Sequence, residues 1–211
     1  MSTRLSPRIR SEKLACAVHV EEAATQPGAD AFFVEKVGEL VGESGPAYRV
    51  AMDALRRAEA ATDMAHDEEE VADSESDKAG SDYFKALRLN CSPEVATAVQ
   101  GLLGGRSPSE VMKSTNRAQL FNLDRFFTLL DARTDLKTPS DRLADWKAKH
   151  EVMRVKVNAS VLCESAQRDA SAAADAAEVS FASDYRLLVQ HLNLLWGEEK
   201  TRAALLSFPG R

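Results

Sequence analysis

The 211-residue sequence contains few helix-breaking residues, with 10 glycines and 7 prolines, and only 6% of its residues are aromatic. Much of its 44% hydrophobic content is alanine, and this composition favours helix over sheet. No apolar run approaches the roughly 18 residues of a membrane span. The N-terminal residues also lack the apolar segment of a signal peptide. We therefore expect an all-α protein without a membrane span, in the cytoplasm or another reducing compartment.

Cysteine is scarce, and its placement excludes two kinds of site. Cys16, Cys91 and Cys163 are odd in number and widely spaced, which indicates neither a disulfide framework nor a zinc motif. Cys16 and Cys163 lie in apolar helical contexts, where a free cysteine behaves as a small buried hydrophobe. The net charge of −6 argues against strong global attraction to nucleic acid or anionic membranes, although a local basic patch remains able to act.

Motifs for catalysis and cofactor binding are missing as well. The sequence has no Gly-x-Ser-x-Gly elbow and no neighbouring Cys-His pair. The segment from Gly101 to Arg106 is glycine-rich but lacks the Gly-Lys-Ser/Thr ending of a phosphate-binding loop, so it predicts a helix end and a hinge. We expect no enzyme, no cofactor and no small-molecule substrate.

Helix starts, by contrast, are well marked. A Ser or Thr cap followed by Pro precedes four expected helices, and at Ser107 the glutamate Glu110 completes a capping box. These starts are Ser6-Pro7, Ser92-Pro93, Ser107-Pro108 and Thr138-Pro139. Together with the breaks at Gln26-Pro27-Gly28 and Gly42–Gly45, they predict helices over about 11–25, 30–41, 46–89, 93–103 and 108–136.

The longest uninterrupted segment covers residues 140–196, which contain neither Gly nor Pro. Apolar residues recur there at helical spacing in two series, the second with the four-three alternation of a coiled coil. The first series is Leu143, Trp146, Met153 and Val157, and the second is Phe181, Tyr185, Leu188, Leu192 and Leu195. Between them the segment is poor in large apolar residues, so a hairpin turning near 168–171 is the alternative, but turn residues are absent there.

The expected fold is an elongated all-α bundle dominated by two long helices, about 46–89 and 140–196, with shorter helices alongside. A basic N-terminal arm (1–13) precedes a first helical half (14–103) and a second (107–211), both in one continuous domain. Phe-Phe, Pro and Ser-Asp-Tyr recur in that order in the two halves, at 32–33, 46 and 81–83 and again at 126–127, 139 and 183–185. Internal duplication is therefore possible, although the spacing differs by nine residues.

Charge is distributed unevenly along the chain. Residues 63–77 carry eight carboxylates, including Glu68, Glu69 and Glu70, and no Lys or Arg. Such a helix must be exposed or must face a basic partner. Two basic segments are candidates for interaction. They are the arm, with Arg4, Arg8, Arg10 and Lys13, and a stretch with Lys147, Lys149, Arg154 and Lys156.

These features favour a non-enzymatic structural protein that forms homo-oligomers or larger assemblies, with the basic arm on the acidic helix of a neighbour. The first alternative is a nucleic-acid-packaging coat or accessory protein that binds phosphates through the arm or the second basic stretch. The second is a carboxylate-type metal-binding bundle using Asp63, His66, Asp67 and Glu70. Paired Glu-x-x-His motifs are absent, however, so a solvated acidic face is favoured and we expect no metal ligands.

Overall fold

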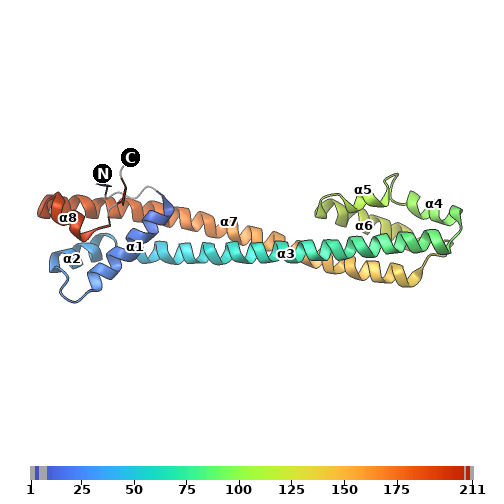
Figure 1. The fold of residues 1–211 in the computed structure, drawn as a ribbon, viewed down its shortest axis with the longest axis horizontal. Helices are drawn as coiled ribbons and strands as arrows, with labels where there is room; N and C mark the ends of the chain where they lie inside the picture. Colours follow the sequence, from blue (N-terminus) through green and yellow to red (C-terminus); the bar gives the residue numbers. More distant parts are fainter. Residues whose placement is uncertain (1–2, 5–8, 207, 210–211) are drawn as a thin grey trace. The chain divides into compact units, whose positions relative to one another are not determined.

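The computed structural model describes residues 3–4, 9–206 and 208–209, with side chains for 9–206. The described residues form eight α-helices and one pair of two-residue strands (Figure 1). The helices are α1 (Arg10–Thr25), α2 (Ala31–Leu40), α3 (Ser44–Asn90), α4 (Pro93–Gly101), α5 (Pro108–Met112), α6 (Asn116–Asp131), α7 (Ser140–Trp196) and α8 (Glu198–Ala204). Strand β1 (Thr3–Arg4) pairs antiparallel with β2 (Phe208–Pro209). The all-α prediction is confirmed.

The two long helices are both present. Helix α7 is continuous over 57 residues, so the hairpin near 168–171 is wrong. Helix α3 runs for 47 residues and includes the whole acidic segment. Without Gly or Pro in the alanine-rich middle of α7, the backbone has no reason to leave the helical conformation. In the part of the chain that the structure describes, no helix is long and apolar enough to span a membrane.

The helices differ from the prediction in two respects. The expected helix over 108–136 is divided, because α5 ends at Met112 and α6 begins at Asn116. Between them the Ser114 hydroxyl donates to the Val111 carbonyl at 2.6 Å, a local bond that competes with helix continuation. Helix α8 was not predicted. The capping box at Ser107 is confirmed, and the start at Ser6-Pro7 lies outside the described residues.

The chain divides into two compact units, and both long helices contribute to each. Unit 1 contains residues 1–60 and 165–211, and unit 2 contains residues 61–164. The two halves expected at 14–103 and 107–211 follow the order of the sequence, whereas each compact unit contains residues from both halves. Unit 1 therefore combines the start of α3 with the end of α7, whereas unit 2 combines the end of α3 with the start of α7.

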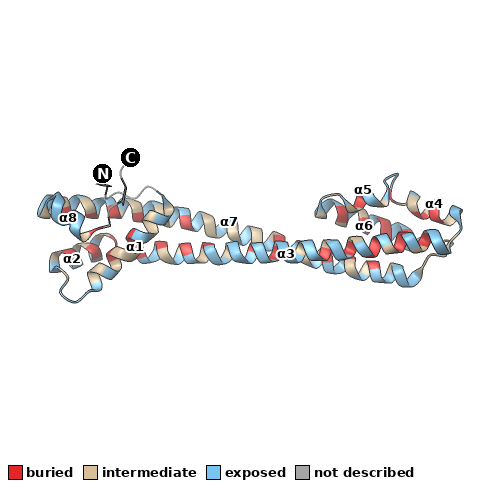
Figure 2. Cartoon of the chain, in the orientation of Figure 1, coloured by how far each residue is buried: buried red, intermediate tan, exposed pale blue. Residues whose placement is uncertain are grey.

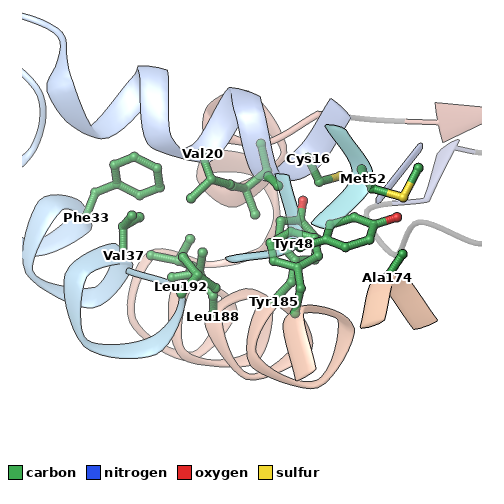
Figure 3. Packing of buried hydrophobic residues seen from close by; sticks show 14 of the residues in the cluster. Cys16, Val20, Phe33, Val37, Tyr48, Met52, Ala174, Tyr185, Leu188 and Leu192 are labelled. Atoms are coloured by element: carbon green, nitrogen blue, oxygen red, sulfur yellow. The ribbon is translucent and has the colours of Figure 1, made fainter. Parts of the chain in front are cut away.

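The core of unit 1 forms where α1 and α2 cover the two long helices. Figure 3 shows side chains from these four helices converging in one cluster. The Tyr48 ring of α3 stacks on Phe181 of α7, with ring centroids 5.6 Å apart. The predicted second series of α7 is buried except for Leu195, and its neighbour Trp196 packs against Phe33 instead. The labelled members are Cys16, Val20, Phe33, Val37, Tyr48, Met52, Ala174, Tyr185, Leu188 and Leu192.

The core of unit 2 is built around Trp146, which is fully buried. Four aromatic rings from α3 and α6 surround it, with centroids 5.0–5.6 Å from its own. They belong to Tyr83, Phe84, Phe126 and Phe127. The buried positions of α4, α5 and α6 lie toward the long helices (Figure 2). The indole rests directly on Gly80, where a Cβ would lie 2.8 Å from Trp146 Cε2.

The repeated motifs occupy comparable places in the two units. Unit 1 buries Phe33 from the first half of the chain with Tyr185 from the second, and unit 2 buries Phe127 from the second half with Tyr83 from the first. Each unit thus joins the Phe-Phe helix of one half to the Ser-Asp-Tyr segment of the other. Internal duplication stays a prediction.

The contact at Gly80 leads to a first prediction. We expect Gly80→Ala to lower the free energy of unfolding by about 1 kcal/mol or more, because overpacking outweighs the gain in helix propensity. The rigid indole cannot retreat as the end of Met112 can. Urea denaturation followed by circular dichroism measures the change. Gly38→Ala, at an open position within α2, should leave stability unchanged or raise it, and equal effects at both sites would contradict the prediction.

Candidate interaction surface

The acidic segment of α3 and the basic stretch of α7 bind each other inside unit 2. Lys149 Nζ lies 2.7 Å from Glu75 Oε2, and Lys156 Nζ lies 2.7 Å from Glu68 Oε2. The order of these pairs shows that the two helices run antiparallel here. The acidic helix was expected to be exposed or to face a basic partner, and two of its carboxylates face the other long helix of the same chain.

The remaining basic residues of this stretch bind carboxylates on the other side of α7. Lys147 Nζ lies 2.5 Å from Asp131 Oδ1 at the end of α6. Arg154 Nη1 donates to Asp124 Oδ2 of α6 at 3.0 Å, and its Nε donates to Glu151 at 2.9 Å. Burial disfavours the ionised Asp124, but Arg154 and His150 outweigh it and hold the Asp124 pKa below its usual value. All four predicted cations of the stretch are therefore paired.

The N-terminal arm is also paired where it is described. Arg10 Nε donates to Glu178 Oε2 at 2.9 Å, and Lys13 Nζ lies 2.5 Å from Glu178 Oε1, so both bind α7 within unit 1. Burial opposes ionisation of Glu178, yet the two cations hold its pKa below the usual value. Arg4 lies in β1 with its side chain outside the described set, and Arg8 lies outside the described residues.

The other acidic candidates line a cleft of about 360 Å³ in unit 2. Glu69 accepts a hydrogen bond from Asn116 Nδ2 at 2.6 Å, and Glu70 is exposed. His66 Nε2 lies 3.2 Å from Glu164 Oε1 across the cleft. Within residues 9–206, no three His, Cys, Asp or Glu side chains are placed to hold a metal ion together.

A buried polar layer lies between α3 and α6. Gln119 is fully buried and donates from Nε2 to Asp77 Oδ1 at 2.7 Å. Gln119 Oε1 and Asp73 Oδ1 have no hydrogen-bond partner. Burial raises the pKa of Asp73, and burial together with the Asp73 charge raises the pKa of Asp77 to about 6. This layer therefore favours protonated carboxyl groups.

Helix α7 carries a second apolar stripe on the side of unit 2 that faces away from this core. Its positions are spaced alternately by four and three residues, which is the pattern of a coiled-coil contact. Val152 is 47% exposed, Val155 57% and Leu162 71%, whereas Met153 and Val157 on the opposite side are buried. We call this stripe the apolar seam. It comprises Ala148, Val152, Val155, Ala159 and Leu162.

Two further apolar side chains on α3 lie near the seam. Met64 is 66% exposed and Val71 is 61% exposed. Both lie within one turn of Glu68, the residue that binds Lys156 of α7. Helix α6 contacts the opposite side of the α3–α7 pair, through Asn116 and Gln119. This side of unit 2 is therefore apolar around its ion pairs and uncovered within the described chain.

The seam was not predicted from the sequence, although its signal is present there. Residues 143–162 contain two interleaved helical stripes, and the one with Trp146 and Met153 has the larger side chains. The second stripe has two alanines among its five positions, so it was not distinguished from the background. Scoring the opposite face of the same helix at heptad spacing would have found it.

Comparison of this chain with protein-family models, with curated proteins and with solved structures gives no match.

The buried layer leads to a second prediction. The pKa of Asp77 is raised from its ordinary value of 3.8 to about 6 in the folded state. Its contribution to stability is therefore fully present when the pH is below 3.8 and is lost as the pH rises through about 6. Asp77→Asn should therefore raise the free energy of unfolding at pH 7.5, by on the order of 1 kcal/mol after solvent screening, and have little effect at pH 4.

Urea denaturation of both proteins at the two pH values measures this difference. Asp67→Asn, on the exposed side of the same helix, is the matched control and should change stability little at either pH. An Asp77→Asn effect of equal size at pH 4 and pH 7.5 would contradict the assignment.

Proposed function

We propose that this chain is a non-enzymatic structural protein that self-associates through the apolar seam of α7. The observation that carries the proposal is the regular exposure of this stripe. Single exposed hydrophobic residues are common on protein surfaces. Five apolar positions at heptad spacing on one helix face, on the side away from its own core, are typical of a surface that binds another helix.

The state of α7 before association supports this proposal. The helix is already held by α3 and α6, so binding would not require the chain to order itself first. The seam covers two heptads, about 21 Å of helix. Such a short contact buries little area, so association is expected to be weak and dependent on concentration. Repeated use of weak contacts is a common property of structural assemblies.

The paired cations favour this proposal over nucleic-acid packaging. Six of the eight basic candidate residues have described side chains, and every one of them lies beside a carboxylate of the same chain. A phosphate would have to displace these carboxylates before it could bind. The same pairing also weakens the original expectation that the arm binds the acidic helix of a neighbour, because Arg10 and Lys13 of the arm and Glu68 and Glu75 of the helix already have partners.

The third prediction concerns the centre of the seam. Val155→Glu should leave the fold intact, because Val155 is exposed in the single chain. In the complex the new carboxylate would be buried against apolar side chains, so self-association should weaken by at least about tenfold. Sedimentation velocity over a range of chain concentrations measures this change.

Leu89→Glu is the matched control, because Leu89 is 83% exposed on α3 and lies outside the seam. This variant should associate as the unmodified chain does. A single monomeric species for the unmodified chain at all concentrations and salt conditions would overturn the proposed function.

A further inference from the structure

We infer that the partner of the apolar seam is the seam of a second copy of this chain, bound parallel and in register, with Glu151 of each copy facing Lys156 of the other. This inference rests on the proposed function and specifies its geometry. It commits to one occupant and one orientation, which the residues beside the seam distinguish.

The flanking residues are the first argument. In the heptad defined by the seam, Val152 and Ala159 occupy positions a, and Ala148, Val155 and Leu162 occupy positions d. Glu151 then occupies a g position and Lys156 the following e position. In a parallel pair of helices, a g residue of one chain faces the e residue five places later in the other. The parallel arrangement thus brings opposite charges together twice, once on each side of the two-fold axis.

The antiparallel arrangement has the opposite effect. An antiparallel pair packs a positions against d positions and places e positions opposite e positions, so Lys156 would meet Lys149 of the second copy. Like charges at this distance repel, and Glu151 would gain no contact with a cation of the second copy to offset the repulsion. Charge complementarity therefore favours the parallel pair.

The residues within the seam agree with a two-stranded contact. Within parallel coiled coils, a β-branched residue at a with leucine at d favours two strands. The central a position is Val152, and the last d position is Leu162. Ala148 and Ala159 at the remaining positions allow the two backbones to approach closely. The departure from the usual pattern is Val155 at d, which reduces the buried volume but leaves the spacing unchanged.

The existing ion pairs do not prevent the new contacts. The Glu151 side chain is 65% exposed and binds Arg154 on its own helix, while Lys156 is 35% exposed and binds Glu68. Exposed pairs of this kind contribute little, so a second carboxylate can share the lysine without losing the first. The added partner would place Lys156 between Glu68 of its own chain and Glu151 of the other copy.

Single cysteines distinguish the two orientations. Cys91 and Cys163 are replaced by serine, and the fully buried Cys16 is retained. In this background, Ala148→Cys and Ala159→Cys should each form disulfide-linked dimers of the full-length chain under mild oxidation, because a parallel pair places each seam position beside its own copy. A mixture of Ala148→Cys and Ala159→Cys chains should give no mixed dimer beyond the level of random collision, because only an antiparallel pair places these two positions side by side.

The charge contact has its own test. Glu151→Lys should weaken dimerisation by about three- to tenfold at low salt, because it creates two Lys–Lys contacts in the parallel pair. Glu151→Gln is the matched control and should have a smaller effect. The difference between the two variants should shrink at high salt, where exposed charges are screened.

The outcomes separate the two proposals. Self-linking at both alanine positions together with the Glu151→Lys effect supports the parallel pair. Efficient linking only in the Ala148→Cys and Ala159→Cys mixture overturns the orientation and leaves self-association standing. Concentration-dependent dimers with no linking at any seam position overturn the seam as the contact. A chain that is monomeric throughout overturns both proposals.

Discussion

The contact of Trp146 with Gly80 is the constraint on which the rest of unit 2 depends. It brings α7 against the backbone of α3, because no side chain stands between the indole and the helix axis. At that separation Lys149 and Lys156 reach the carboxylates Glu75 and Glu68. It also fixes the rotation of α7, since the face that carries the indole must point inward. The apolar seam points outward for the same reason, as the opposite face of a helix whose orientation the tryptophan determines.

The charges of this protein act mainly within the chain. A segment with eight carboxylates looks like a docking site when the sequence is considered alone. In the fold, some of these groups bind the basic side of α7, and others lie in a half-buried layer where protonation is favoured. The apolar surface between and beside these ion pairs is uncovered among the described residues. In the proposed dimer, charge orients an association that apolar contact drives.

Much of the fold could be predicted because its signals are local. Caps such as Ser107 with Glu110, and the absence of Gly and Pro from residues 140–196, depend only on neighbours in sequence. The break at Ser114 was missed because a side-chain hydrogen bond there competes with a helix that the apolar pattern otherwise supports. The pairing of Lys149 with Glu75 was beyond sequence reasoning, since it depends on how two distant segments align. The same holds for the role of Gly80, which in sequence resembles a weak point of the helix and in the fold makes room for Trp146.

The division of the long helices between two units has a consequence for how the chain acquires its structure. Unit 2 is a continuous segment, residues 61–164, whereas unit 1 needs residues from both ends of the chain. Its core includes Cys16 and Leu205, which are separated by almost the whole sequence. Contacts between such distant residues form slowly, because a long loop must close first. During synthesis, unit 2 can therefore fold while the last residues of unit 1 are still being added, and the apolar faces of α1 and α2 must wait for them. The chain is thus exposed to misassembly longest at its N-terminal helices, although these are the first to be made.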